Sequence, residues 1–240
     1  MILFSNVSKG FGGKKVLDGF TLDIPDGQTT VLLGYSGTGK SVALKHIVGL
    51  LEPDQGEVLV DGRVVHELSR DALAEMRASI GYVFQFAALF DSLTVYQNIA
   101  LGLEHQGRSE EVVRERVATS LERVDLVGSA ERYPSELSGG MRKRVGIARA
   151  IALEPRYILY DEPTTGLDPV TSAVIDDLMV RTKRELGVTG VVVTHDMRSA
   201  FAVADRIAML YQGKVHLAGS VEEIKRTTDP IVRQFIEGRP

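Results

Sequence analysis

The chain has 240 residues, of which 44% are hydrophobic and 25% are charged, and its formal net charge is −4. This length and composition allow one sizeable globular core, and the slightly acidic balance argues against a broad nucleic-acid surface, which needs clustered Lys and Arg. The sequence contains no cysteine, which excludes disulfides, thiolate zinc sites and cysteine nucleophiles.

Apolar runs in this chain are short. None approaches the roughly 18 residues that a membrane-spanning helix needs, and residues 1–6 lack the basic start and long apolar stretch of a signal peptide. We therefore expect neither segment. The five histidines include no pair spaced four residues apart, so we do not expect a metal site built mainly on histidine.

The first part of the chain is predicted to be rich in strands. Apolar and polar residues alternate over 20–24, and 30–33 is a short apolar strand that leads directly into glycines. From Ser41 the apolar spacing becomes helical, and we expect this helix to end at Pro53. Asp61-Gly62 then predicts a type I′ hairpin between 58–60 and 64–65.

The rest of the chain alternates helices and strands. Ser109 is a predicted N-cap of a helix whose apolar residues recur from Val113 to Val124. We expect another helix near 198–204. Further predictions are a helix over 141–153 and strands over 157–160 and 191–193.

This alternation predicts an α/β fold. We expect a mostly parallel P-loop (RecA-like) sheet, an antiparallel β subdomain at the N-terminus and an inserted helical subdomain. The predicted organisation is a single domain over 1–240, with the helical subdomain at about 86–155 and a short tail at about 228–240. Pro230 suits the first position of a tail helix. The apolar residues of that helix either pack on the same domain or on a neighbouring copy.

The segment Gly34–Ser41 reads G-Y-S-G-T-G-K-S and matches the P-loop pattern G-x-x-x-x-G-K-[ST]. Glycines let successive N–H groups curl around a phosphate, and the N-terminus of the following helix adds positive potential. In this pattern Lys40 reaches the β and γ phosphates and Ser41 binds Mg²⁺. An ordinary glycine-rich turn is the alternative, but the strand before and the helix after favour nucleotide binding.

Two adjacent carboxylates, Asp161 and Glu162, follow the predicted strand 157–160. In P-loop ATPases an aspartate at such a strand end holds Mg²⁺. Because the side chains of a strand alternate with period two, Glu162 points the other way, so that it can orient and polarise the attacking water as a general base. A pair of solvated acids is the alternative, and the P-loop makes the catalytic interpretation preferable.

A second glycine motif, Leu137-Ser138-Gly139-Gly140-Met141, precedes a helix that carries Arg142, Lys143 and Arg144. Ser138 is a natural N-cap, and the glycines leave N–H groups exposed at the helix start. Since one bound nucleotide already has its phosphates in the P-loop, this second anion site predicts that the nucleotide of another copy docks there.

Together these motifs, in this order, resemble the ABC ATPase family over essentially the whole chain. Segment 137–141 is similar to the family's signature motif, 165–168 to its D-loop, Gln85 to its Q-loop glutamine and His195 to its switch histidine. Phe11, ahead of Val16, resembles the aromatic that stacks on adenine. Taken singly, Phe11, Gln85 and His195 are more ordinary as packing or surface residues; the order of the matches favours their functional roles.

The resemblance implies ATP and Mg²⁺ as cofactors. It places Glu162, His195 and Lys40 in hydrolysis, with Ser41, Gln85 and Asp161 at Mg²⁺. The implied nucleotide contacts are Phe11, Val16, Gly34, Ser36, Gly37, Thr38, Gly39, Lys40, Ser41, Val42, Gln85, Ser138, Gly139, Gly140 and Asp168. The signature motif usually ends in Gln, so Met141 departs from the pattern and offers no amide.

Several longer stretches resemble the Mla/Mce-associated ATPases, among them 86–95, 137–145, 160–169 and 229–235. That likeness implies a subunit on the cytoplasmic face of the inner membrane that powers phospholipid or other lipid transport. Its implied partners are a second copy of itself, permease subunits, an MCE-domain protein and, in some systems, a STAS-domain protein. No nucleic-acid partner is expected. An importer ATPase for another substrate and a non-transport ABC ATPase are the alternatives.

The loop after Gln85 is unusually apolar, with Phe86, Leu89, Phe90 and Leu93. These side chains either form a groove for a short permease helix or pack internally, and the sequence leaves both readings open.

Overall fold

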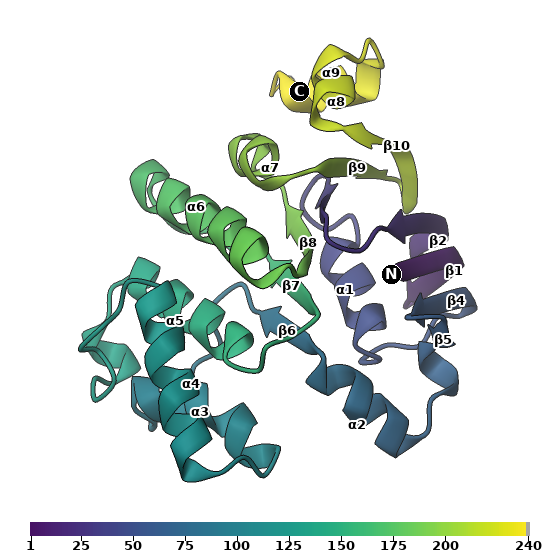
Figure 1. The fold of residues 1–240 in the computed structure, drawn as a ribbon. Coiled ribbons are helices and arrows are strands. Elements are labelled where there is room, and N and C mark those ends of the chain that lie inside the picture. Colours follow the sequence, from purple (N-terminus) through teal and green to yellow (C-terminus); the bar gives the residue numbers. More distant parts are fainter. Residues whose placement is uncertain (239–240) are drawn as a thin grey trace. The chain divides into compact units, whose positions relative to one another are not determined.

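The computed structural model describes residues 1–238, so the last two residues of the predicted tail, 239 and 240, lie outside the described part of the chain. The chain divides into two compact units. The first unit comprises residues 1–77 and 189–240, and the second unit comprises residues 78–188. In Figure 1 the first unit carries the purple, blue and yellow elements, and the second unit carries most of the teal and green helices.

The first unit contains strands of two sheets, with helices α1 and α7 packed against them. Its helices and strands are β1 (Ile2–Phe11), β2 (Lys14–Ile24), β3 (Thr29–Leu33), α1 (Lys40–Ile47), β4 (Gln55–Val60), β5 (Arg63–Val64), α2 (Arg70–Ala78), β8 (Thr189–Thr194), α7 (Met197–Val203), β9 (Arg206–Tyr211), β10 (Lys214–Ser220), α8 (Val221–Arg226) and α9 (Pro230–Ile236).

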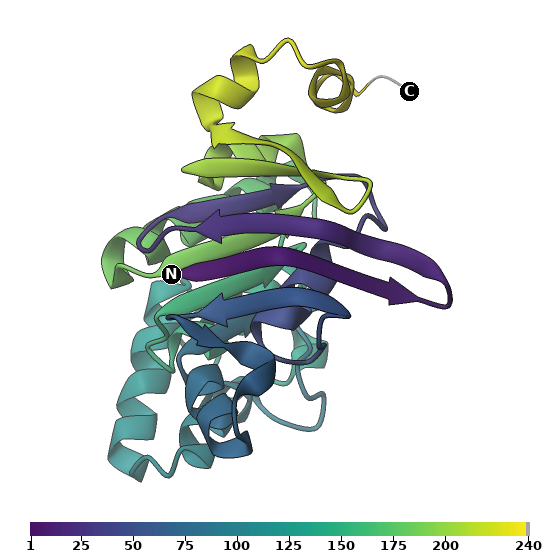
Figure 2. The ribbon, with the colours of Figure 1, turned by 90° about the vertical axis from the view of Figure 1, so that its right-hand side faces the viewer.

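One sheet is antiparallel and has the strand order β2-β1-β4-β5. Figure 2 shows its long strands β1 and β2 running side by side. In the other sheet, this unit contributes strands in the order β10-β9-β3-β8, and β3 is parallel to both β8 and β9. Every residue of β3 and β8 is buried, as expected of central parallel strands that are covered on both faces.

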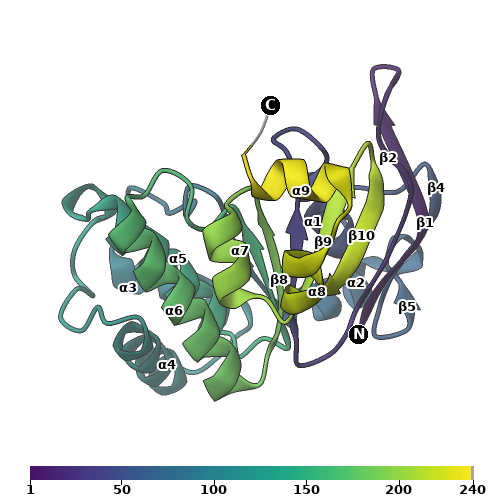
Figure 3. The same ribbon diagram turned by 90° about the horizontal axis from the view of Figure 1, so that it is seen from above.

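The second unit is mainly helical around one parallel strand pair, in which β6 pairs with β7. Its helices and strands are β6 (Ile80–Val83), α3 (Val95–His105), α4 (Glu110–Arg123), α5 (Gly139–Ile151), β7 (Tyr157–Asp161) and α6 (Pro169–Leu186). Helix α5 contacts α3, α4, α6 and β6 and is therefore the central helix of this unit (Figure 3).

The predicted α/β class, with an antiparallel N-terminal sheet and inserted helices, is confirmed. The predicted strands over 20–24, 30–33, 157–160 and 191–193 lie within β2, β3, β7 and β8, and Ser109 caps α4 as expected. Whether residues 86–155 form a subdomain of their own stays a prediction.

Three predicted elements had wrong boundaries. Helix α1 ends at Ile47 rather than at Pro53, because Gly49 takes a left-handed conformation with φ 64° and breaks the helix earlier. Helix α5 starts two residues before the predicted Met141 because Ser138 caps it, and it ends at Ile151. Strand β5 stops at Val64 because a short 3₁₀ helix begins at Val65.

The predicted type I′ hairpin is present: Asp61 and Gly62 both have positive φ between β4 and β5. Among the described helices, none combines the length and apolarity required to span a membrane.

The tail helix α9 packs on the first unit. Its N-cap Asp229 accepts hydrogen bonds from the N–H groups of Ile231 and Val232, both at 3.0 Å, and pairs with His216 of β10 at 2.9 Å. Val232 is fully buried, and the Phe235 ring packs edge-on against Tyr35 of the glycine loop with centroids 4.8 Å apart. Whether α9 also contacts a second copy stays a prediction.

Replacing Asp229 with Ala tests this anchor, because the change removes the acceptor of two helix N–H groups together with the partner of His216. Amide hydrogen exchange over 230–236 is expected to accelerate by about 2- to 30-fold, the range for losing an N-cap. Asp229→Asn keeps the capping oxygen and should stay close to the parent. Unchanged exchange in the Ala variant would show that the cap does not hold α9.

Candidate functional site

The glycine loop after β3 is shaped by two close backbone approaches. A side chain at Gly34 would begin 2.6 Å from the carbonyl oxygen of Leu210 on β9. A side chain at Gly39 would meet Val16 at 2.8 Å, and Gly39 also has φ 104°, which other residues rarely adopt. Only glycine fits at these two positions, so the path of the loop is fixed by its neighbours.

The middle of this loop is open. Gly37 has φ 76°, and an added side chain there would meet no atom within 4 Å. Helix α1 starts at Lys40 with no side chain capping its first N–H groups and no acidic residue in its first turn. The partial positive charge at the N-terminus of α1 is therefore not neutralised by a residue of its first turn. Unbonded N–H groups and this positive charge suit the binding of a phosphate group.

The side chain of Lys40 turns back into the loop. It is only 5% exposed, and its Nζ donates to the carbonyls of Gly34 at 2.9 Å and Tyr35 at 3.0 Å. The Thr38 hydroxyl donates to the same Tyr35 carbonyl at 2.8 Å. These bonds place a cation at the loop rather than in solvent.

Other predicted nucleotide contacts in the first unit surround this loop to different degrees. Val16 touches the position of Gly39, whereas Phe11 lies at the end of β1 with 46% of its surface exposed and Lys9 5.8 Å from its ring centre. Ser36 is exposed, and Ser41 and Val42 are half-buried on α1. His195 follows β8 and is exposed.

In the second unit the two carboxylates lie at the end of β7, but the reason predicted for their different orientations was wrong. Strand β7 ends at Asp161, and Glu162 leaves it in a left-handed conformation with φ 48°. The turn of the backbone, and not the period of a strand, therefore separates the two side chains. A non-glycine residue in this conformation stores about 1 kcal/mol or more, and such strain is often found at functional sites.

Each carboxylate has a hydroxyl partner. The Tyr82 hydroxyl of β6 donates to Asp161 Oδ2 at 3.2 Å, and burial together with the negative charge of Asp161 raises the pKa of Tyr82. The Thr165 hydroxyl donates to Glu162 Oε2 at 3.0 Å. Glu162 is 9% exposed, so its carboxylate lies in a largely desolvated setting.

Gln85 follows β6 and is half-buried. Its carbonyl accepts a hydrogen bond from the Lys143 Nζ of α5, which also donates to the Glu162 carbonyl at 3.3 Å. Burial lowers the pKa of Lys143 to about 8, while the charges of Glu162 and Asp161 act in the opposite direction. This lysine brings the segments after β6 and β7 together.

The second glycine motif has a packing role that its sequence did not reveal. Ser138 caps α5 by accepting from the Met141 N–H at 3.3 Å, and Gly139 is exposed. Gly140 is buried, and a side chain there would begin 2.5 Å from Thr171 Cγ2 on α6. Gly140 is therefore required for the close approach of α5 and α6.

Asp168 is the N-cap of α6 and holds Thr171 in place. It accepts from the N–H groups of Val170 and Thr171 at 3.0 Å each, and from the Thr171 hydroxyl at 2.5 Å. The Thr171 hydroxyl bond is the main reason that the pKa of Asp168 lies below its usual range. Because that bond fixes the Thr171 rotamer, its methyl group cannot easily move away from Gly140.

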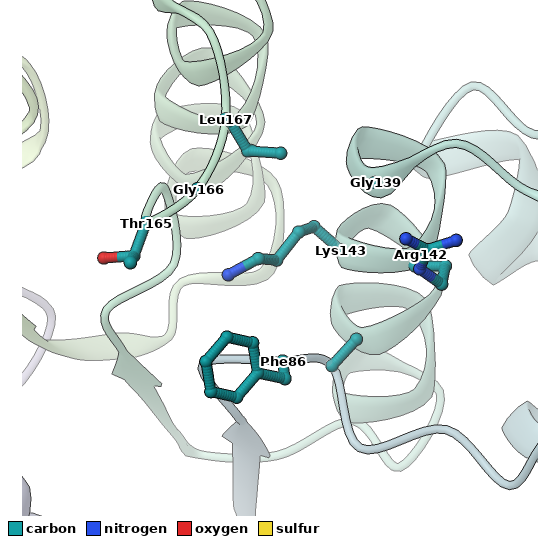
Figure 4. Close-up of a pocket in the computed structure, with 8 residues that line it drawn as sticks. Phe86, Gly139, Arg142, Lys143, Thr165, Gly166 and Leu167 are labelled. Carbon is teal, nitrogen blue, oxygen red and sulfur yellow. The ribbon is translucent and has the colours of Figure 1, made fainter.

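A cavity of about 280 Å³ lies between these elements, and Figure 4 shows the residues that line it. The Lys143 side chain extends from α5 toward Thr165 and Phe86, and the loop Thr165–Leu167 forms the opposite wall. The remaining lining residues are Ala87, Gly139 and Arg142. Polar groups of α5 and of the loop that follows β7 therefore face one small space.

No sequence motif singled out Tyr82 or Thr171, and Lys143 and Thr165 were expected only as members of the helix after Gly140 and of segment 165–168, without roles of their own. A signal for Lys143 was present, because it lies three residues after Gly140 and four before Ile147, on the buried stripe of α5. A charged residue inside an apolar helical stripe needs a partner. The positions of Tyr82 and Thr165 depend on contacts that the sequence pattern does not encode.

Comparison with known proteins gives consistent matches. A model of the ABC transporter family matches residues 17–165. A probable ribonucleotide transport ATP-binding protein, Mkl of Mycobacterium leprae, is 43% identical over 97% of this chain and 67% of its own length. This chain thus spans about two thirds of that relative.

Two further matches cover a larger share of the matched protein's own length. The intermembrane phospholipid transport system ATP-binding protein MlaF of Escherichia coli K12 is 40% identical over 97% of this chain and 87% of its own length. A solved dimeric ATP-binding cassette, in a post-hydrolysis state with ADP and phosphate, superposes with a TM-score of 0.83 at 36% identity. That match covers 92% of this chain and 99% of the other.

The contact between Gly140 and Thr171 predicts an unusual response to mutation. Gly140→Ala should destabilise the protein by about 1–3 kcal/mol through overpacking, although Gly→Ala in a helix normally stabilises by up to about 1 kcal/mol. Thr171→Ser removes the methyl group and keeps the hydroxyl, so the double variant should recover most of the loss. Denaturant unfolding measures each free energy.

Gly146→Ala on the same helix is the matched control, because its added methyl would meet Ala87 at an ordinary 3.4 Å. It should be neutral or stabilising. Equal effects at positions 140 and 146, or no rescue by Thr171→Ser, would contradict the packing role of Gly140.

Proposed function

Since this chain belongs to the ABC transporter family, in which it is an ATP-hydrolysing subunit, we propose that it powers a separate membrane permease. The observation that carries this proposal is the loop after β3. There, glycines forced by close packing lead into an uncapped helix, and a buried lysine faces the loop. That arrangement suits the phosphates of ATP.

The proposed nucleotide contacts are those of the sequence analysis. Lys40 serves the β and γ phosphates, and the loop N–H groups hold the phosphate oxygens. Ser41, Gln85 and Asp161 would hold Mg²⁺ through oxygen atoms, the ligands that this ion prefers, and the ion would neutralise phosphate charge. Phe11 is supported as an adenine contact by its exposed ring beside Lys9, next to the strand that carries Val16.

We propose that Glu162 is the residue that orients and polarises the attacking water, with His195 assisting at the γ-phosphate. The support is its partial burial, its strained backbone and the hydroxyl of Thr165 on one carboxylate oxygen. General-base catalysis of this kind contributes typically 10²- to 10⁴-fold.

The dimer is proposed to form head to tail around two ATP molecules, so that Ser138, Gly139, Gly140 and Asp168 serve the nucleotide of the other copy. Gly139 is exposed at the start of α5, which supports this role, whereas buried Gly140 acts through packing. The similar dimeric cassette supports the assembly by likeness.

The proposed cargo is phospholipid or another lipid. The support is the likeness to MlaF, whose name refers to intermembrane phospholipid transport, and the Mla/Mce-like stretches of the sequence. An MCE-domain protein and a STAS-domain protein are proposed partners on the same basis, and the proposed location is the cytoplasmic face of the inner membrane. Mkl, named for ribonucleotide transport, favours a different cargo. Lipid analysis of the complex copurified in mild detergent separates the two.

The permease contact is proposed to lie on the second unit. An open cavity of about 500 Å³ there is mostly apolar and is lined by Tyr82, Leu101, Gly102, His105, Arg149, Ala150 and Leu153. Arg149 joins it to the apolar loop by donating to the carbonyls of Ala87 and Ala88, both at 2.7 Å. In that loop Phe86 is 81% and Phe90 53% exposed, whereas Leu89 and Leu93 are half-buried. The exposed rings support docking of a short permease helix.

Replacing Glu162 with Gln tests the hydrolytic assignment. ATP should still bind, because the amide preserves the size and the Thr165 contact, but turnover should fall by about 10²- to 10⁴-fold through loss of the base. Single-turnover hydrolysis and nucleotide binding measure the two effects. Normal turnover in this variant would remove Glu162 from the mechanism.

Replacing Leu101 with Glu tests the permease surface. Leu101 is 40% exposed on α3 and lines the cavity. A docked permease helix would bury the new charge at a cost, so copurification of the permease should be lost while ATP binding remains. Val127→Glu is the control, because Val127 is 78% exposed and lies outside that cavity. Equal copurification of both variants would place the permease contact elsewhere.

A further inference from the structure

Lys143 is an unusual residue for the buried face of a helix. Its side chain is 6% exposed, on a stripe of α5 whose other members are glycine and aliphatic residues. Lysine is rarely buried unless it is paired. Here both hydrogen bonds of the ammonium go to backbone carbonyls, those of Gln85 and Glu162, and none goes to a carboxylate oxygen.

The two carbonyls occupy equivalent positions in the fold. Gln85 comes two residues after the end of β6, and Glu162 directly follows β7. These strands are parallel neighbours, with Val83 paired to Tyr160 at their ends. The ammonium therefore connects the segments that follow β6 and β7, just beyond the point where the hydrogen-bond ladder between these strands stops. Figure 4 shows the Lys143 side chain extending away from α5 toward Thr165 and Phe86.

The Glu162 backbone needs such a restraint. Its φ of 48° is strained for a residue with a side chain, and strained conformations persist only where the surroundings enforce them. The Glu162 carbonyl accepts hydrogen bonds from Lys143 Nζ and from the Thr165 N–H, and the Thr165 hydroxyl donates to one carboxylate oxygen. Together these bonds restrain the peptide of Glu162 and its carboxylate.

Packing alone does not account for a lysine here. Taking an ammonium out of water is costly, and an apolar residue of similar volume often serves a buried position as well or better. Methionine has nearly the same length and would fill the same space. A charge retained at this position therefore indicates a role in which the hydrogen bonds themselves matter.

We propose that Lys143 is a positioning residue for ATP hydrolysis, which holds the peptide of Glu162 so that its carboxylate meets the attacking water in the productive direction. Through the Gln85 carbonyl the same ammonium keeps the Q-loop segment in register with Glu162. This inference rests on the proposed role of Glu162 as the base. Lys143 itself transfers no proton and touches no substrate.

Arg144 supplies a matched control on the same helix. It too donates to two backbone carbonyls, those of Val124 at 3.0 Å and Asp125 at 2.9 Å, but both lie after α4 and away from the carboxylates. If Lys143 only stabilised the backbone, its replacement would affect kcat as little as the replacement of Arg144. A positioning cation would affect the chemical step specifically.

The test compares Lys143→Met with Arg144→Met in the full chain, using steady-state ATPase kinetics and thermal unfolding. We expect Lys143→Met to keep its folded stability and a KM within about threefold of the parent, while kcat falls about 10- to 100-fold, as for a small misplacement of a reacting group. Arg144→Met should change kcat by less than about threefold. Equal kcat in Lys143→Met and the parent, or a matching loss in Arg144→Met, would overturn the inference.

The double variant Lys143→Met/Glu162→Gln adds a readout that a structural role would not produce. If Lys143 acts through Glu162, the double variant turns over as slowly as Glu162→Gln alone, because residues that act as a unit are not additive. Multiplied losses would overturn the inference. Should Lys143→Met fold poorly, Lys143→Gln, which keeps one donor, must show an intermediate kcat; a kcat at the parent level would likewise contradict it.

The outcomes separate this inference from the proposed function. Normal turnover in Glu162→Gln removes the base itself and with it the premise. Loss of turnover in Glu162→Gln together with parent-level kcat in Lys143→Met removes only the positioning role and leaves the ATPase mechanism intact.

Discussion

The close approach of backbone segments around the glycine loop is the constraint on which the first unit depends. The Leu210 carbonyl and the Val16 side chain occupy the space where side chains at Gly34 and Gly39 would begin. Neighbouring strands therefore restrain the loop at these two glycines. Preorganised donors hold a developing charge without the cost of reorientation, and Lys40 adds a cation bound to the loop itself.

In the second unit a tight turn of the backbone is made without glycine. After β7 the chain must turn sharply, and a glutamate takes the left-handed conformation there. The restraint comes from the backbone N–H of Thr165 and from side chains: Lys143 also binds the carbonyl of Glu162, and the Thr165 hydroxyl binds its carboxylate. A residue that needs a functional side chain at a strained position cannot be replaced by glycine, so the stabilisation must come from its surroundings.

Helix α5 connects the two proposed activities of this unit. Its Lys143 holds the carbonyl of Gln85, and its Arg149 holds those of Ala87 and Ala88, which both have positive φ. One short segment is thus restrained at both ends by cations of a single helix. Arg149 also lines the cavity proposed for the permease. A shift of that segment would therefore displace Lys143 and, through it, the backbone of Glu162. This contact is a physical path for the proposed coupling between permease and ATPase.

The sequence by itself determined the α/β class, most strand and helix positions and the P-loop, because apolar periodicity, turn residues and glycine spacing are local signals. Only the tertiary structure decided that Gly140 serves packing against Thr171, that Glu162 leaves its strand in a left-handed conformation, and that Lys143 is buried beside it. These facts depend on which residues meet across α5, α6 and β7, far apart in the chain. A local pattern records the periodicity of each element but not the partner that each side chain finds.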